Sequence, residues 1–429
     1  MNRSISSRIF PLIFLLLSVT SLSAQLGKLD SLYYGNMGLG AACLGGFVQP
    51  DSSVIIFGQF GNCNERVTPC IAKIKQDGSN DYTFNIGSGA GPNGYYVTCV
   101  TRQSDGKLLV GGSFSSFNGT TPKGIIRLNT NVSTDTSFHS GTGFNSAIPP
   151  YAIYVQPSGS IVLAGSFAGY NGVSSPGIVR LLSNGTRDTS FHCGTGPNAG
   201  VTSMIAQPNG QILVGGNFTK YNGVTDSGIA LLNSDGSLDT TFSLQRGPGA
   251  GKAIYSLALK PGGKIMVGGS FTAWAGRTEN YIARLNSNGT LDTTFSTGTG
   301  FNNYVYSIIV QPNNQLVLGG GFTIYKGSSA NYVNRMDAVG DSDGTFSVST
   351  GPDGALNSVF LNYDGKVFAS GSFSTVDSFA LHNLVRLQST VGIDQTFFYN
   401  SKLNYAANTV VTQSTGKVIL GGYLRNTMT

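Results

Sequence analysis

One phrase is repeated along almost the whole of this 429-residue chain. The copies align on the apolar residue that ends a glycine-rich run, and these residues are spaced 51 to 54 apart: Phe60, Phe114, Phe167, Phe218, Phe271, Phe322, Phe373 and Leu424. A fixed period of this kind is typical of solenoids and propellers, in which each repeat packs mainly on its neighbours. The period therefore limits the fold more than any other feature of the sequence.

Each copy contains four short apolar runs, which in one copy are Tyr281–Asn286, Thr290–Ser296, Val305–Gln311 and Gln315–Phe322. The runs are rich in Val, Ile, Leu, Phe and Tyr and are bounded by Gly, Asn and Pro, which predicts strands and no helices. Ile308–Val310 and Leu316–Leu318 are continuously apolar, and this pattern favours sheets that are buried on both faces. Paired glycines such as Gly319–Gly320 are expected where neighbouring blades crowd the backbone.

The sequence thus predicts an all-β β-propeller of about eight four-stranded antiparallel blades, with seven blades as the alternative. The Val305–Gln311 and Gln315–Phe322 types of run occur together eight times, whereas the Tyr281–Asn286 type occurs seven times. The chain begins near Asp30 on a strand of the Thr290–Ser296 type, and we expect this N-terminal strand to close the ring. The last blade is expected to be incomplete, because the chain stops at Thr429.

The first 24 residues have the order of a secretory signal peptide. Arg3 and Arg8 precede the apolar stretch Ile9–Leu17, and small residues follow up to Ala24. The stretch is shorter than the ~20 residues that span a bilayer, although an uncut anchor is the alternative. We therefore expect residues 25–429 to form a single propeller domain that is secreted or on the cell surface.

Few residues of the chain are charged. They make up 11% of it, against about 25% in an average protein. The formal net charge of +6 is small and dispersed, which argues against nucleic acid or membrane insertion after signal cleavage. We expect a monomer whose surface is mostly Gly, Ser, Thr and Asn.

Several stretches resemble the delta-60 repeat of bacterial secreted proteins, and they are Gln207–Phe218 (QPNGQILVGGNF), Gly236–Phe242 (GSLDTTF) and Tyr281–Phe295 (YIARLNSNGTLDTTF). The resemblance covers nearly all of residues 26–424. It implies a β-propeller in an extracytoplasmic setting. It implies no established activity.

A basic residue is followed eight positions later by an aspartate in six repeats: Lys73/Asp81, Arg127/Asp135, Arg180/Asp188, Arg284/Asp292, Arg335/Asp343 and Arg386/Asp394. One interpretation is a ring of carboxylates that binds cations. The other is a cross-strand ion pair within the blade, and we favour it because six of the seven repeats carry the same pair and binding sites seldom repeat identically. In one repeat Leu231 replaces the base while Asp239 remains, so the aspartate is expected to have its own role at the turn.

An aromatic residue recurs three positions after the phenylalanine that ends the Gln315–Phe322 type of run: Phe117, Tyr170, Tyr221, Trp274 and Tyr325. These rings could form a row of exposed platforms for sugar rings or peptide side chains. They could instead fold onto their own blades as plugs, which their regular position favours. If a ligand binds here, Tyr221, Trp274 and Tyr325 are the candidate ligand-binding residues.

Neither the cysteines nor the histidines indicate catalysis. Cys63 and Cys70 lie close enough in sequence to form a disulfide, whereas Cys43, Cys99 and Cys193 have no evident partners. The histidines, which are His139, His192 and His382, lack metal-site spacing, and no nucleophile elbow is present. We therefore predict no catalytic, cofactor or metal residues.

The predicted function is a non-catalytic binding, adhesion or structural module for protein or carbohydrate. The alternative is a hydrolase or lyase with its site at the mouth of the central channel. A catalytic propeller should carry unique acids, histidines or arginines in a few loops, whereas most loops here are short and nearly uniform.

Overall fold

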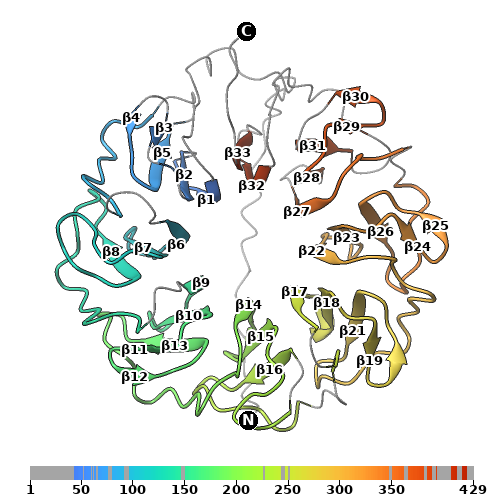
Figure 1. The fold of residues 1–429 in the computed structure, drawn as a ribbon, viewed down its shortest axis with the longest axis horizontal. Coiled ribbons are helices and arrows are strands. Elements are labelled where there is room, and N and C mark those ends of the chain that lie inside the picture. Colours follow the sequence, from blue (N-terminus) through green and yellow to red (C-terminus); the bar gives the residue numbers. More distant parts are fainter. Residues whose placement is uncertain are drawn as a thin grey trace, which may run out of the picture.

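The computed structural model describes residues 43–422 apart from 52, 59, 61, 64–65, 76–79, 91–95, 146–149, 226–227, 243–246, 250–251, 347–349, 362–365, 381–383, 389–392, 394–406 and 413–417. The described strands form antiparallel sheets arranged around a central axis (Figure 1). The predicted signal peptide, the strand near Asp30 and Leu424 lie outside the described residues.

The described part of the chain contains seven three-stranded sheets and six two-stranded ones, five of which are small hairpins. The inner strands lie nearest the axis (Figure 1): β1 (Cys43–Val48), β6 (Val97–Arg102), β9 (Pro150–Val155), β14 (Val201–Ala206), β17 (Ile254–Leu259), β22 (Val305–Val310), β27 (Leu356–Leu361) and β32 (Ala407–Thr412). The middle strands are β2 (Val54–Gly58), β7 (Leu108–Gly112), β10 (Ile161–Gly165), β15 (Ile212–Gly216), β18 (Ile265–Gly269), β23 (Leu316–Gly320), β28 (Val367–Gly371) and β33 (Val418–Gly422). The outer strands are β5 (Ile71–Ile74), β8 (Ile125–Leu128), β13 (Ile178–Leu181), β16 (Ile229–Leu232), β21 (Ile282–Leu285), β26 (Val333–Met336) and β31 (Leu384–Leu387).

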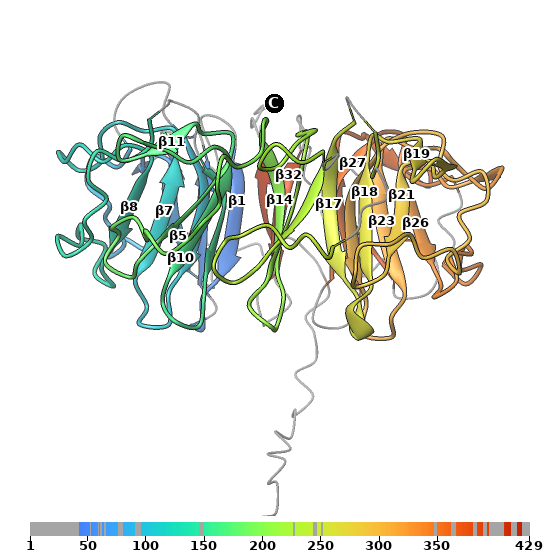
Figure 2. The ribbon, with the colours of Figure 1, turned by 90° about the horizontal axis from the view of Figure 1, so that it is seen from below.

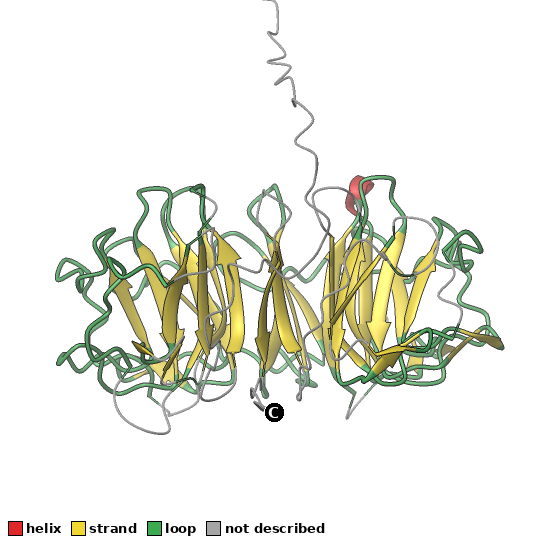
Figure 3. Ribbon diagram, turned by 90° about the horizontal axis from the view of Figure 1, so that it is seen from above, coloured by secondary structure: helices red, strands yellow, loops and turns green. Residues whose placement is uncertain are grey.

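Small two-residue hairpins connect the middle and outer strands of several blades: β3–β4 (Asn62–Cys63, Arg66–Val67), β11–β12 (Gly169–Tyr170, Val173–Ser174), β19–β20 (Ala273–Trp274, Arg277–Thr278), β24–β25 (Ile324–Tyr325, Ser328–Ser329) and β29–β30 (Thr375–Val376, Phe379–Ala380). We call the side of the ring that carries them the hairpin face (Figure 2). The opposite side, the turn face, carries the turns between inner and middle strands, including the short 3₁₀ turn Pro261–Gly263 (Figure 3). The inner strands therefore run from the hairpin face to the turn face.

The predicted fourth strand of each blade is corrected by the structure. In its place is a single β-bridge, such as Leu285 with Leu291, followed by a turn. The Asp292 carboxylate accepts hydrogen bonds from the backbone N–H (3.1 Å) and hydroxyl (2.6 Å) of Thr294, and the Phe295 N–H donates to the Asp292 carbonyl. An aspartate that binds the backbone two residues ahead favours a turn and ends the ladder.

The hydrophobic core lies between neighbouring sheets, as the continuous apolar runs predicted. Met266 and Ile282 of one blade, for example, share a cluster with Val305 and Leu318 of the next. All five residues of each of the middle strands β7, β10, β15, β18, β23 and β28 are buried. The phenylalanines that end the repeats are also buried, with Phe271 and Phe322 fully so.

The paired glycines lie at two different close approaches. A Cβ on Gly268 would come within 2.7 Å of Val305 in the next blade, which confirms the expected crowding between blades. A Cβ on Gly269 would instead collide with the Ala253 carbonyl of its own blade. Both positions therefore need glycine for steric reasons, but only the first concerns the packing between blades.

In the part of the chain that the structure describes, no helix is long and apolar enough to cross a membrane.

Candidate functional site

The predicted ion pairs form in the five repeats whose two residues are both described. The distances are 3.2 Å for Lys73–Asp81, 2.7 Å for Arg127–Asp135, 2.7 Å for Arg180–Asp188, 2.8 Å for Arg284–Asp292 and 2.8 Å for Arg335–Asp343. A backbone hydrogen bond from the aspartate N–H to the carbonyl of the base holds the two residues opposite each other. The prediction of a cross-strand ion pair is confirmed for these repeats, while Asp394 of the sixth lies outside the described residues.

Three of these arginines, Arg127, Arg180 and Arg284, also contact the following blade, as Arg284 shows. Its Nη1 donates to the carbonyl of Ala338 in the next blade, and its Nη2 donates to Thr294 Oγ1 at 2.9 Å. The guanidinium lies 4.7 Å from the centroid of the Phe295 ring. Burial raises the pKa of Asp292, but hydrogen bonds from Lys264, Thr294 and Arg284 outweigh it and hold the pKa well below its usual range. These charges join blades and are not available to a ligand.

Asp239 keeps its turn where Leu231 replaces the base. Its carboxylate accepts hydrogen bonds from the Thr241 N–H at 2.9 Å and the Thr241 hydroxyl at 2.6 Å. Gln211 Nε2 donates to the other carboxylate oxygen at 2.8 Å and takes the place of the missing cation. The expectation that the aspartate has its own role is confirmed.

The candidate ligand-binding residues Tyr221, Trp274 and Tyr325 are fully buried, with at most 1% of each residue exposed. Each ring packs on the phenylalanine at the end of its own repeat or on the ring of the preceding link, as Trp274 does on Phe271 at 5.3 Å. The prediction of exposed platforms is therefore wrong, and the plug interpretation describes where the rings lie. The small hairpins explain the outcome, because their register turns each ring toward the blade.

Hydrogen bonding differs among these buried rings. The Tyr325 hydroxyl donates to the Gly340 carbonyl at 2.6 Å. Tyr221 Oη and Trp274 Nε1 have no hydrogen-bond partner among the described residues. Burial raises the pKa of Tyr221 and of Tyr325, so both phenols are neutral at physiological pH.

The predicted Cys63–Cys70 disulfide stays a prediction, because the side chain of Cys63 lies outside those described. Cys99 and Cys193 are buried free thiols, as expected of structural cysteines. Burial raises the pKa of Cys99 to about 12, which makes it a poor nucleophile. Within the described ranges, no group of three or more His, Cys, Asp or Glu residues is arranged to hold a metal ion.

An exposed group of aromatic residues that the repeat did not predict lies on the hairpin face, where strands β17, β21 and β22 begin. We call Tyr255, Tyr281, Tyr304 and Tyr306 the tyrosine cluster. Ring centroids are 5.5 Å apart for Tyr255–Tyr306, 5.6 Å for Tyr281–Tyr304, and 6.2 Å for Tyr255–Tyr304 and Tyr304–Tyr306. Tyr304 is 38% exposed, and the other three are half-buried. Four rings from two adjacent blades thus form one surface.

Strand irregularities place two of these rings. In β17 the pairing to β18 shifts between Ile254 and Ser256, and in β22 the pairing to β23 shifts between Val305 and Ser307. The bulged residues are Tyr255 and Tyr306. A bulge leaves one residue outside the ladder and redirects its side chain. All eight inner strands have this shift, so the bulge places the two rings but does not by itself mark a site.

Tyr281 takes an unusual backbone conformation to reach the cluster. Its φ of +69° lies in the left-handed region, where the equivalent residues of three other blades are glycines (Gly124, Gly177 and Gly228). Such a conformation costs on the order of 1–3 kcal/mol in a residue other than glycine. The cost does not mark a site by itself, since Tyr332 shares the conformation.

Sequence reasoning missed the cluster for a specific reason. The recurring rings stand at one fixed position in five repeats, whereas these four tyrosines stand at other positions and occur in fewer repeats. Tyr at the second inner-strand position of two successive repeats, with Tyr304 just before, was a usable signal.

The ring of sheets with its core between blades defines the chain as a β-propeller repeat protein. It belongs to the family described as Domain of unknown function (DUF5122) beta-propeller, whose model matches just over half of the chain, at residues 49–84, 103–138, 156–191, 207–242, 261–295 and 311–346. Each match begins just after an inner strand and ends at the phenylalanine three residues after the aspartate that recurs in each repeat. No curated protein matches the sequence.

The chain is also similar to solved propellers. The Dos1 propeller has a TM-score of 0.50 and 10% identity, over 89% of this chain and 91% of that one. The WD40 β-propeller domain of Doa1 has a TM-score of 0.46 and 15% identity, over 82% and 93%. The extracellular domain of the one component system BT4673 from B. thetaiotaomicron has a TM-score of 0.48 and 15% identity, but this chain covers only 39% of it. These similarities show the fold alone.

Proposed function

We propose that this chain is a secreted, non-catalytic binding module that recognises a neutral carbohydrate on the tyrosine cluster. One observation carries the proposal, namely four packed rings on the hairpin face with Tyr304 38% exposed. Tyrosines combine a broad apolar face with a hydroxyl that donates and accepts hydrogen bonds. They also lose little conformational entropy on binding, since each has two side-chain torsions.

The charge of the cluster favours a neutral ligand. Burial, together with the neighbouring Tyr255 and Tyr304, raises the pKa of Tyr306, so this phenol stays uncharged at physiological pH. The adjacent exposed residues Asn302 and Asn303 carry amides that are also neutral. Sugar rings present alternating apolar faces and hydroxyl edges, which match rings and phenols better than a charged peptide does.

The proposal includes the finer architecture. We propose eight blades, a repeat of the delta-60 type, closure of the ring by the strand near Asp30, and a monomeric protein exported by the signal peptide at residues 1–24. The position of β32 between β27 and β1 supports eight blades, because it occupies the remaining place in the ring (Figure 1).

Calorimetric titration of the purified chain with neutral oligosaccharides of several classes tests the function. Tyr304→Ala and Tyr306→Ala are each expected to weaken binding about tenfold, which corresponds to ~1.4 kcal/mol for a lost ring contact. Tyr82→Ala is the matched control, because Tyr82 is 67% exposed but lies outside the cluster. No binding in any class, or equal affinity of the Tyr304 and control variants, refutes the proposal.

A further inference from the structure

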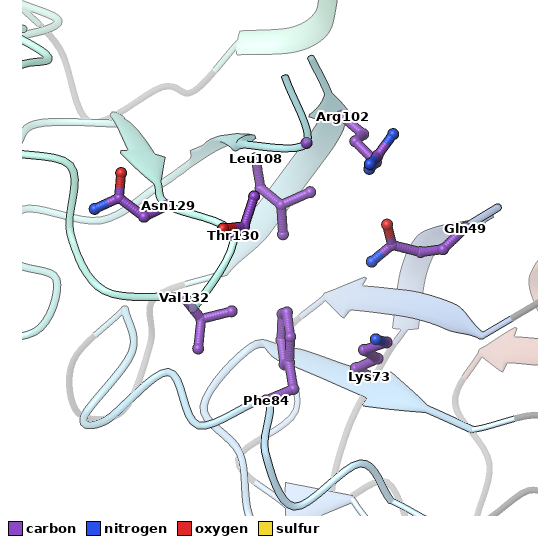
Figure 4. A pocket seen from close by; sticks show the side chains of 9 residues that line it. Gln49, Lys73, Phe84, Arg102, Leu108, Asn129, Thr130 and Val132 are labelled. Carbon is purple, nitrogen blue, oxygen red and sulfur yellow. The ribbon is translucent and has the colours of Figure 1, made fainter. Parts of the chain in front are cut away.

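A pocket of about 140 Å³ lies on the turn face between the β1–β2–β5 and β6–β7–β8 blades. The first blade contributes Gln49, Lys73 and Phe84, and the second contributes Arg102, Gly106, Leu108, Asn129, Thr130 and Val132 (Figure 4). In Figure 4 the polar ends of Arg102, Gln49 and Lys73 lie along one side, with Phe84 and Val132 facing them. The pocket thus has a polar wall and an apolar wall.

The pocket lies where the contact between blades departs from the repeat. Arg127 and Arg180 each donate through Nη1 to a carbonyl of the following blade, at Ser183 and Ser234. The equivalent residue of the first blade is Lys73, and its Nζ contacts Asp51 at 3.1 Å and Asp81 at 3.2 Å, both in its own blade. The carbonyl that corresponds to Ser183 belongs to Thr130, which lines the pocket.

The apolar wall contains a strained residue. Val132 has a φ of +62° and is the only β-branched residue in the left-handed region within the described ranges. The equivalent positions of the next two blades are glycines, Gly185 and Gly236, against which Phe138 and Phe191 of the preceding blades pack closely. Val132 has a side chain where these glycines have none. The side chain is 3% exposed and lies beside the pocket. Strain of this kind is a reason to look for function at the site.

Arg102 supplies the unbalanced charge. It is the only charged residue in the eight inner strands, and its equivalents in the neighbouring blades are Val48 and Val155. A Cβ on Gly106 would meet Arg102 Nη2 at 3.1 Å, so the guanidinium lies against this glycine. Among the described residues no acidic group forms a salt bridge with Arg102, whereas Lys73 is balanced by two carboxylates.

We infer that this pocket binds an oxyanion, the carboxylate or phosphate group of a small ligand, with the Arg102 guanidinium as the principal partner. The planar guanidinium matches both groups in a bidentate geometry. Gln49 and Thr130 line the pocket with neutral side chains that can donate hydrogen bonds, and Phe84 and Val132 receive the apolar part of the ligand. Engineered cavities of about this volume hold a molecule the size of benzene, so a short carboxylic acid or a phosphate group fits, and the rest of a larger acid would extend beyond the pocket.

The test uses the full chain and ligand-observed NMR titration with D-glucuronate, acetate and inorganic phosphate, and with D-glucose as the neutral probe. We expect saturable binding of at least one anion and none of glucose. Glucuronate binding without phosphate binding identifies a carboxylate ligand, and the reverse identifies a phosphate ligand. Absence of saturable binding by all three anions overturns the inference.

Two variants separate this site from general surface charge. Arg102→Gln should weaken anion binding about tenfold or more, because it removes a charge-assisted hydrogen bond. The control Arg277→Gln removes the same charge from an exposed hairpin on the opposite face and should bind as the wild type does. Equal loss in both variants overturns the inference.

Lys73→Arg keeps the net charge but lets the side chain reach the Thr130 carbonyl, as Arg127 reaches Ser183, and so fills the pocket. It should abolish binding with no loss of thermal stability. Wild-type affinity in this variant would show that the anion binds outside the pocket, and it would overturn the inference.

Discussion

Replacement of Arg284 by leucine, the residue that another blade carries at Leu231, tests how strongly the arginines join the blades. The change removes the hydrogen bond to the Ala338 carbonyl in the next blade, and because Ala338 is exposed, water can bind this carbonyl in the variant, so the net cost is about 0.5–1.5 kcal/mol. It also removes the contact with the Phe295 ring, worth about 0.5–1 kcal/mol. Asp292 keeps Lys264 at 2.7 Å, so the larger cost of an unpaired buried charge is avoided. We expect a loss of about 1–2.5 kcal/mol in the free energy of unfolding.

Urea unfolding followed by the fluorescence of Trp274 measures this loss, because Trp274 is the only tryptophan and is fully buried in the same blade. Lys264→Ala is the control: its side chain is 38% exposed, so its ion pair is largely screened and the loss should stay below about 1 kcal/mol. If Arg284→Leu changes the free energy of unfolding by no more than the control does, the arginine does not stabilise the contact between blades.

The same pair sets a pH dependence. The pKa of Asp292 is lowered in the folded protein, so its carboxylate stabilises the fold above the unfolded pKa of about 3.9, and this stabilisation is lost as the pH falls below that value. Arg284→Leu removes one cause of the lowering. The difference in stability between wild type and variant should therefore be full at pH 7 and should shrink only as the pH falls through the folded-state pKa values of Asp292, which Lys264 and Thr294 hold below the usual range in both proteins. A difference that stays constant down to the lowest pH at which both proteins remain folded would show that the ion pair contributes nothing.

Two further changes test the packing. Phe271→Ala should cost about 3–5 kcal/mol in the free energy of unfolding, because this ring is fully buried. The control Phe379→Ala changes a residue that is 41% exposed and should cost far less. An unchanged melting temperature for Phe271→Ala would contradict the assigned core. Gly268→Ala should cost about 1–3 kcal/mol in the free energy of unfolding, because its Cβ would lie 2.7 Å from Val305. The control Gly344→Ala has no atom within 4 Å of the new Cβ and should be nearly neutral. Urea titration measures both variants, and equal costs would show that the blades do not crowd Gly268.

The fold could be predicted from the sequence because its determinants recur at fixed offsets. The eight-residue spacing of Arg284 and Asp292 indicated two residues opposite each other across a turn, and the structure joins them at 2.8 Å. The fourth strand could not be predicted correctly in the same way. Apolar residues near Leu291 and Phe295 resembled a strand, but the Asp292 side chain binds the backbone of Thr294 and forms a turn instead.

The direction of a recurring ring was harder to predict than its position. The offset of Trp274 from Phe271 suggested equally an exposed platform and a buried plug. The outcome depends on the β19–β20 hairpin, where Trp274 pairs with Arg277 and only one of the two side chains faces the blade. Trp274 is fully buried and Arg277 is exposed. A two-residue strand has too short a pattern to reveal this choice from sequence.

Both proposed sites lie where a residue other than glycine takes a conformation that glycine holds in neighbouring blades. Tyr281 and Val132 each accept strain of about 1–3 kcal/mol that their glycine counterparts avoid. Tyr332 accepts the same strain and, like Tyr281, is half-buried against a core cluster, so strain alone does not identify a site. Tyr281 differs because it packs on the exposed Tyr304, and Val132 because it lines a pocket that contains the only inner-strand charge. In a propeller whose blades are otherwise built alike, a strained residue beside an exposed ring or an unpaired charge is therefore a stronger indication of binding than any residue that every blade shares.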